Sequence, residues 1–186
     1  MTPDPLETKI PRGRTVIGPV VTVHFDGACQ PPRGGGVATY GFAVEGEGLD
    51  HEESGLAVRP WSESASNNVA EYVAAINALL WLRGRSFRGT VLLLGDSQLV
   101  VRQMQGEYEV RSERLRPYHA HLVQLVREFA EVRFDWIPRE QNERADALSK
   151  EALAREGSIA RRLRPRAGEP ANVSEDRPSD AADPVD

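Results

Sequence analysis

The sequence predicts an α/β domain built on one central sheet. Its first third contains strand-like segments at residues 20–25, 37–45 and 55–58, where apolar residues recur between Gly-rich turns. Helical spacing of apolar residues then takes over, interrupted by further strand segments at residues 90–94 and 132–136. A meander of strands followed by alternating helices and strands is typical of a mixed sheet with helices packed on it.

The helices follow from the 3- and 4-residue spacing of apolar side chains. Helices are expected at residues 69–83, 97–104, 115–129 and 142–155. Ser66 or Asn67 is a suitable N-cap for the first of them, and Gly84 is a suitable stop. The strand at residues 90–94 is apolar throughout, which predicts a central strand covered on both faces.

Length and composition indicate one domain with two flanking segments. In the 186 residues we expect a flexible N-terminal arm at 1–18, a folded domain at 19–157 and a disordered C-terminal tail at 158–186. The net charge of −5 argues against indiscriminate binding to polyanions, so a basic patch or metal ions would have to attract one. There is no apolar run of membrane-spanning length, and the single cysteine, Cys29, suits a reducing compartment. We therefore expect a cytoplasmic monomer.

Four acidic residues stand at comparable places beside apolar segments. Asp26 and Asp96 each follow a strand, whereas Glu71 and Asp146 lie in the first turns of predicted helices. A buried carboxylate is costly unless it meets a metal ion or another cation. Ligands of α/β sheets bind beyond the carboxyl ends of strands, so all four acids can share one edge. Such a cluster would bind hard divalent cations, which prefer oxygen ligands.

Four stretches of the chain resemble, in order, the sequence blocks of type 1 ribonuclease H. These stretches are DGAC followed by GGG, then SNNVAEYVAAINAL, GDSQLVV and NERADALSK, and the resemblance covers roughly residues 20–155. It implies a five-stranded mixed sheet, with three antiparallel strands and then two parallel ones, flanked by helices. It also implies an endonuclease that hydrolyses the RNA strand of RNA–DNA hybrids and leaves 5′-phosphate and 3′-hydroxyl ends.

The resemblance assigns roles to the four acids. Two Mg²⁺ ions are implied, with Mn²⁺ as an alternative, and Asp26 would bridge both. Asp146 would complete the site that holds the attacking water, whereas Glu71 and Asp96 would complete the leaving-group site. Two cations placed in this way can activate water and neutralise charge during an in-line phosphoryl displacement.

The resemblance also implies a set of substrate contacts. These positions are Gly27, Ala28, Cys29, Ser66, Asn67, Asn68 and Gln98. Backbone groups of the first three would sense RNA 2′-hydroxyls, which separate RNA from DNA. The serine stands where the family holds a DNA phosphate, and the three amides would reach base edges in the minor groove. The two asparagines could instead serve only as helix caps.

The sequence departs from the best-known bacterial members at three places. The loop at residues 137–146 has no histidine, so Arg139 and Glu140 are its charged stand-ins. The segment at residues 105–113 is short and acidic where those members carry a basic handle that grips the hybrid. Gly95 replaces the usual threonine before the third acid. We expect activity to persist with weaker binding.

Simpler explanations exist for each feature alone. Glu71 could only complement the helix dipole, and Asp146 could only pair with Arg144 or Lys150. The arginines in residues 161–166 are either a solvated basic stretch or a weak phosphate-binding segment. The ordered set of four acids favours the nuclease interpretation over these explanations.

Two further functional classes compete with the hybrid endonuclease. One is a binding module of the same fold that does not cleave, which the presence of all four acids disfavours. The other is a related nuclease, such as a 3′–5′ exonuclease or a DNA transposase. The exonucleases carry a DxE pair on the first strand, whereas this chain has Asp26, Gly27 and Ala28 there.

Overall fold

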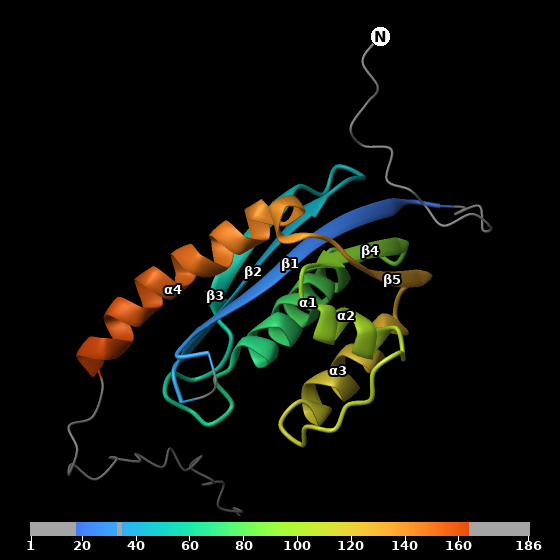
Figure 1. Cartoon of the computed structure of the whole chain (residues 1–186). Helices are drawn as coiled ribbons and strands as arrows, with labels where there is room; N and C mark the ends of the chain where they lie inside the picture. Colours follow the sequence, from blue (N-terminus) through green and yellow to red (C-terminus); the bar gives the residue numbers. More distant parts are fainter. Residues whose placement is uncertain (1–17, 33–34, 164–186) are drawn as a thin grey trace, which may run out of the picture.

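The structure is a computed structural model that describes residues 18–32 and 35–163. The expected N-terminal arm lies outside the described residues except for Gly18, as does the tail after residue 163. A five-stranded sheet runs through the middle of the domain, with helices on both faces (Figure 1). Its strands are β1 (Val20–Gln30), β2 (Val37–Glu45), β3 (His51–Leu56), β4 (Thr90–Gly95) and β5 (Glu131–Trp136).

The sheet has the strand order β3-β2-β1-β4-β5. The pairs β1–β2 and β2–β3 are antiparallel, whereas β1–β4 and β4–β5 are parallel. The five-stranded mixed sheet, with three antiparallel strands and then two parallel ones, is therefore confirmed. Because β1 lies at the centre, it borders both halves of the sheet and can bring their side chains together.

Two strands differ from the sequence prediction. The third strand was expected at residues 55–58, but β3 begins at His51 and pairs with β2 from His51↔Val44 to Leu56↔Thr39. Its first residues are polar because β3 is an edge strand, so the apolar pattern misses them. The first strand does not end before Asp26, since β1 continues to Gln30 in antiparallel pairing with β2. Only its parallel pairing with β4 ends there, at His24↔Leu94.

Helices cover both faces of the sheet. They are α1 (Asn67–Gly84), α2 (Gln98–Met104), α3 (Arg116–Val126), the short 3-10 helix η1 (Arg139–Gln141) and α4 (Glu143–Leu163). The first three lie on one face, and α4 crosses the other face alone (Figure 1). None of the described helices is long and apolar enough to cross a membrane.

The last helix extends beyond its predicted end. A disordered tail was expected from residue 158 onward, but α4 continues as a regular helix to Leu163. No proline interrupts this stretch before Pro165, and Ala160 is buried. Because no helix breaker intervenes and the side chain of Ala160 is packed, the helix continues for about two more turns. These extra turns bring Arg161 onto the domain, where it lines a cavity with Gln30 and Val37.

The core lies mainly between the sheet and the helices α1 and α3. Its largest fully buried side chains are Tyr72, Phe25, Phe42, Leu79, Leu82, Leu93, Leu122 and Leu125. Trp81 packs against this core, whereas Trp136 at the end of the edge strand β5 is 45% exposed. Trp136 is exposed because it is the last residue of β5, which is an edge strand of the sheet.

Candidate active site

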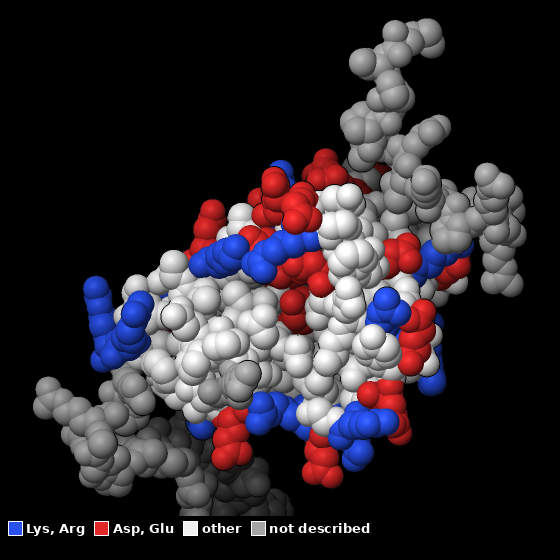
Figure 2. All heavy atoms as spheres, in the orientation of Figure 1, with Lys and Arg blue, Asp and Glu red and all other residues white. Residues whose placement is uncertain are grey.

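Three of the four predicted acids meet at the centre of the sheet. Asp26 lies on β1 just past the end of its pairing with β4, Glu71 lies in the second turn of α1, and Asp96 directly follows β4. Each offers a carboxylate oxygen, and these oxygens all lie within 4.8 Å of one another. Asp26 is 5% exposed and Glu71 is 6% exposed. Figure 2 shows acidic atoms in the middle of one face, next to basic side chains.

Gly27 allows α1 to approach β1 closely enough for this meeting. A Cβ atom at Gly27 would lie 2.2 Å from the backbone N of Glu71 and 2.7 Å from the Cβ of Ala70. These are backbone and near-backbone atoms, so they cannot move aside. The glycine after Asp26 therefore sets the distance at which Glu71 stands from the strand.

Gly41 has the same role on the opposite face. It is the cross-strand partner of Asp26 on β2. A Cβ atom at Gly41 would lie 2.6 Å from the backbone N of Ser149 and 2.8 Å from the backbone O of Ala145. The missing side chain lets α4 rest directly on the sheet beside Asp26.

Asp146 lies beside the cluster without joining it. It stands in the first turn of α4, and its carboxylate forms ion pairs with Arg139 and with Lys150, whose Nζ lies 2.6 Å from Oδ2. Ser149 links it to the cluster, because its hydroxyl hydrogen-bonds to the Asp26 carboxylate and lies 3.0 Å from the backbone O of Asp146. The structure therefore brings Asp26, Glu71 and Asp96 together and holds Asp146 next to them.

The electrostatics of the cluster follow from burial and like charge. Burial raises the pKa of Asp26 to about 6, with Asp96 and Asp146 adding to the rise and the Ser149 hydrogen bond opposing it. Burial, followed by the charges of Asp26 and Asp96, raises the pKa of Glu71 well above its ordinary value. For Asp146, partial burial is outweighed by Lys150 and Arg139, so its pKa lies below the ordinary value.

The residues of the cluster fit a divalent cation. The backbone N–H of Gly27 hydrogen-bonds to the Glu71 carboxylate, yet Glu71 Oε2 is buried with no partner in the described part of the chain. A buried carboxylate oxygen without a donor costs free energy that a coordinated cation would offset. Three carboxylates crowded together provide the hard oxygen ligands and the negative charge that such a cation requires.

Four residues support the acids, and two of them, Asn142 and Ser149, were not singled out from the sequence. Asn142 is fully buried, and its Nδ2 donates to the backbone O of Phe25 at 3.0 Å and lies 3.4 Å from Asp96 Oδ1. The others are Ser149, Lys150 and Arg139. Helix spacing could have indicated three of them, because residues 142, 149 and 150 lie three or four positions from residue 146. The partner of Lys150 was among those considered from the sequence, whereas no local pattern indicated that Asn142 contacts Phe25 or that Ser149 contacts Asp26.

The predicted substrate positions fall into three places. A cavity of about 290 Å³, named here the active-site cavity, is lined by Asp26, Gly27, Ala28, Cys29, Asn67, Arg139, Asp146 and Lys150, among others. Ser66 and Asn68 line another cavity of about 450 Å³ between α1 and the loop after α2. Gln98 is exposed at the start of α2. Ser66 also caps α1, since its Oγ accepts a hydrogen bond from the backbone N–H of Val69 at 3.4 Å.

Two of the sequence departures acquire a physical reason. A Cβ atom at Gly95 would lie 2.5 Å from the ring of Phe25, so this ring occupies the place of a side chain before Asp96. Arg139 stands in the loop where the histidine is absent, and the hydrogen bond to Asp146 raises the pKa of its guanidinium further. The loop therefore places a permanent cation at the acids in place of a titrating group.

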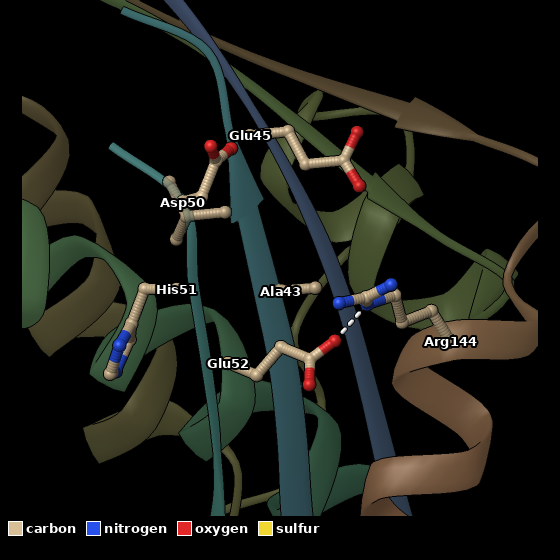
Figure 3. Close-up of a pocket in the computed structure, with 7 residues that line it drawn as sticks. Ala43, Glu45, Asp50, His51, Glu52 and Arg144 are labelled. Atoms are coloured by element: carbon tan, nitrogen blue, oxygen red, sulfur yellow. Dashed lines mark ion pairs between the residues drawn. The ribbon is translucent and has the colours of Figure 1, made fainter. Parts of the chain in front are cut away.

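Another cavity lies at the β2–β3 edge, away from the cluster. It has a volume of about 400 Å³, and its lining includes three acidic residues, His51 and Arg144. Figure 3 shows Arg144 pointing toward Glu52, with which it forms an ion pair, while His51 points elsewhere. The His51 ring stacks on Trp81 at 4.3 Å. Arg144 is thus occupied by Glu52, and of the two cations considered from the sequence only Lys150 pairs with Asp146.

Known proteins resemble this chain in sequence. The sequence profile of the reverse transcriptase-like family matches residues 52–152. Ribonuclease HI of Halobacterium salinarum is 38% identical over 134 residues, which make up 72% of this chain and 64% of that protein. The chain spans less than two thirds of the length of the curated relatives it matches.

Solved structures give the same result. The N-terminal RNase H domain of Rv2228c from Mycobacterium tuberculosis superposes with a TM-score of 0.67 at 28% identity, covering 77% of this chain and 99% of that one. LC11-RNase H1, solved in complex with an RNA/DNA hybrid, gives 0.64 at 33% identity, with coverages of 73% and 98%. The fold is that of the ribonuclease H class. The chain belongs to the type 1 ribonuclease H family, as its sequence blocks predicted.

Proposed function

We propose that the protein is an endonuclease that hydrolyses the RNA strand of RNA–DNA hybrids with two bound Mg²⁺ ions, for which Mn²⁺ could substitute. The observation that carries the proposal is the meeting of Asp26, Glu71 and Asp96 within 4.8 Å, in a family whose solved members include a hybrid complex. The unpartnered Oε2 of Glu71 supports a bound cation. The single buried cysteine supports action in a reducing compartment such as the cytoplasm.

The four acids would bind different metal ions according to their surroundings. Divalent cations bound here would act as Lewis acids toward the phosphate and lower the pKa of the attacking water. Asp26, whose carboxylate meets those of Glu71 and Asp96, would contribute to both ion sites, and Glu71 and Asp96 would hold one of the two ions. Asp146 would hold the other side, where Ser149 ties its helix to Asp26.

Arg139 and the backbone after Asp26 would position the RNA strand. The guanidinium of Arg139 lines the active-site cavity, and its charge acts on Asp26, Asp96 and Asp146. Its planar set of N–H donors could hydrogen-bond to a phosphate oxygen there. Gly27, Ala28 and Cys29 line the same cavity with Asn67, so their backbone groups can meet a 2′-hydroxyl.

Metal binding and product chemistry test this proposal together. Adding Mg²⁺ should raise the melting temperature of the protein, because a ligand that binds only the folded state stabilises it. The Asp26→Asn variant should lose most of this shift. Cleavage of end-labelled hybrid should leave 5′-phosphate and 3′-hydroxyl ends. No melting shift with Mg²⁺ or Mn²⁺, together with no cleavage, would refute the proposal.

A further inference from the structure

A second cavity lies along α4 beyond the active-site cavity. This distal cavity has a volume of about 230 Å³, and its lining includes Pro31, Trp61, Gly157 and Arg161. Gln30 and Leu153 line both the distal cavity and the active-site cavity. The two cavities therefore adjoin and form one path between α4 and the end of β1.

One face of α4 follows this path. Lys150 lines the active-site cavity, Leu153 lines both cavities, and Gly157 and Arg161 line the distal one. Their spacing of three or four residues places them in one row on the helix. From Lys150 to Arg161 the helix rises roughly 17 Å. Over about the same length of duplex axis, one strand carries about five phosphates. A basic residue thus stands at each end of a row that fits several nucleotides.

The chemistry of the distal cavity suits a nucleotide. Arg161 Nε donates to the backbone O of Gly157 at 3.0 Å, which orients an exposed guanidinium at the end of the path. Arginine is the side chain best matched to phosphate oxygens. Figure 2 shows basic side chains at the left end of this face, near the last turns of α4 in Figure 1.

Trp61 and Gly157 shape the cavity. Trp61 has a φ of 64°, uncommon for a bulky residue, and its backbone N–H donates to the backbone O of Gly36 at 2.7 Å. This hydrogen bond fixes the backbone at Trp61, which lines the cavity, and aromatic side chains in such sites can stack on bases. Strained backbone of this kind is concentrated at functional sites. Gly157 leaves the floor open, since a Cβ there would meet only Arg161 Nη2, at 4.0 Å.

We propose that the distal cavity is a second nucleic-acid subsite, which binds a phosphate and the adjoining base of the RNA strand several nucleotides from the bond to be cleaved. The proposal rests on the proposed function. It assigns the RNA strand because the path starts at Asp26 and Asp146, where that strand would be cut. Such a subsite would supply the grip that the short acidic segment at residues 105–113 does not.

Binding measured without cleavage tests the subsite. In an Asp26→Asn background of the full chain, Arg161→Gln should weaken binding of a long hybrid roughly tenfold, the size of one charged hydrogen bond. Gly157→Leu should weaken it similarly by filling the cavity. Arg162→Gln is the matched control: Arg162 is exposed on the same turn and does not line the cavity, so binding should change by less than about twofold. Melting temperatures verify that every variant is folded.

Trimmed hybrids identify the strand. The effect of Arg161→Gln should vanish when the RNA strand is shortened on one of its two sides, and it should persist when only the DNA strand is shortened there. Equal effects of Arg161→Gln and Arg162→Gln would overturn the proposal, as would an effect that disappears only on trimming DNA. Turnover by the unaltered protein is measured in parallel, so an absent nuclease activity is distinguished from an absent subsite.

Discussion

Arg139 and Asp146 form an ion pair at the edge of the carboxylate cluster, with the guanidinium donating directly to the carboxylate. The pair links the short helix η1 to the first turn of α4. Lys150 donates to the other oxygen of the same carboxylate at 2.6 Å. Asp146 is therefore paired with two cations, whereas Asp26 and Glu71 have no basic side chain hydrogen-bonded to them among the described residues.

Removing Arg139 should change metal affinity. The charge of Arg139 repels a divalent cation near Asp146, so Arg139→Ala should tighten Mg²⁺ binding roughly fivefold, as expected for nearby charges partly screened by water. Calorimetric titration with Mg²⁺ measures this, and high salt should reduce the difference. Arg144→Ala is the matched control, because Arg144 pairs with Glu52 away from the cluster. Unchanged or weaker Mg²⁺ binding by Arg139→Ala would contradict the role of the pair.

Asp26→Asn should abolish hydrolysis and keep the fold. An amide is a poor metal ligand, while removing one charge from a buried cluster relieves repulsion. The pKa of Asp26 is raised to about 6 from 3.8, so the metal-free variant should be as stable as the parent or more stable, by at most ~3 kcal/mol. Urea unfolding without metal gives this difference. Strong destabilisation would mean that Asp26 contributes to folding through Ser149 more than it costs.

The stability difference between Asp26→Asn and the parent protein should depend on pH. Because the folded-state pKa of Asp26 lies above its unfolded value, the charged form is penalised only in the folded protein. The penalty is absent below about pH 4, grows between about pH 4 and 6, and is complete above about pH 6. The stability advantage of Asp26→Asn should therefore grow across this window in the absence of metal. Saturating Mg²⁺ should cancel or reverse it, and an advantage that is constant with pH would contradict the assignment.

The close approach of α1 to β1 can be tested by adding a single Cβ atom at Gly27. Gly27→Ala places a Cβ 2.2 Å from the backbone N of Glu71, so α1 must shift and take Glu71 away from Asp26. We expect a loss of about 1–3 kcal/mol of stability and a larger loss of Mg²⁺ binding. Gly84→Ala is the control, since no atom lies within 4 Å of a Cβ there. It should leave binding unchanged and stability equal or up to about 1 kcal/mol higher.

The sequence was sufficient to predict the elements that have a recognisable local pattern of residues. Ordered acids beside apolar segments predicted a cluster of four, of which Asp26, Glu71 and Asp96 meet, and the spacing of apolar residues predicted α1 and β4. The distant contacts carried no local signal. Asn142 hydrogen-bonds to Phe25, 117 positions earlier, and Ser149 to Asp26, 123 positions earlier, so neither partnership could be read from the chain.

Elements at the margins of the domain were predicted least well. The polar start of β3 is determined by its pairing with β2, not by its own residues. The last turns of α4 have too little apolar pattern to be separated from a tail, although Ala160 is buried. Nothing in the sequence distinguishes the roles of Gly27, Gly41 and Gly95, yet in the structure each leaves space for a different neighbouring residue. Such roles become visible only when distant segments are packed together.

We propose that this carboxylate cluster cuts RNA paired to DNA. The most direct test is cleavage of labelled RNA–DNA hybrid, duplex RNA and duplex DNA side by side, with Mg²⁺ and with chelator, by the parent protein and by Asp26→Asn. We predict internal cleavage of the RNA strand of the hybrid alone, only with metal and only by the parent. Cleavage of duplex DNA or RNA at a comparable rate, or of the hybrid by Asp26→Asn, would contradict the account.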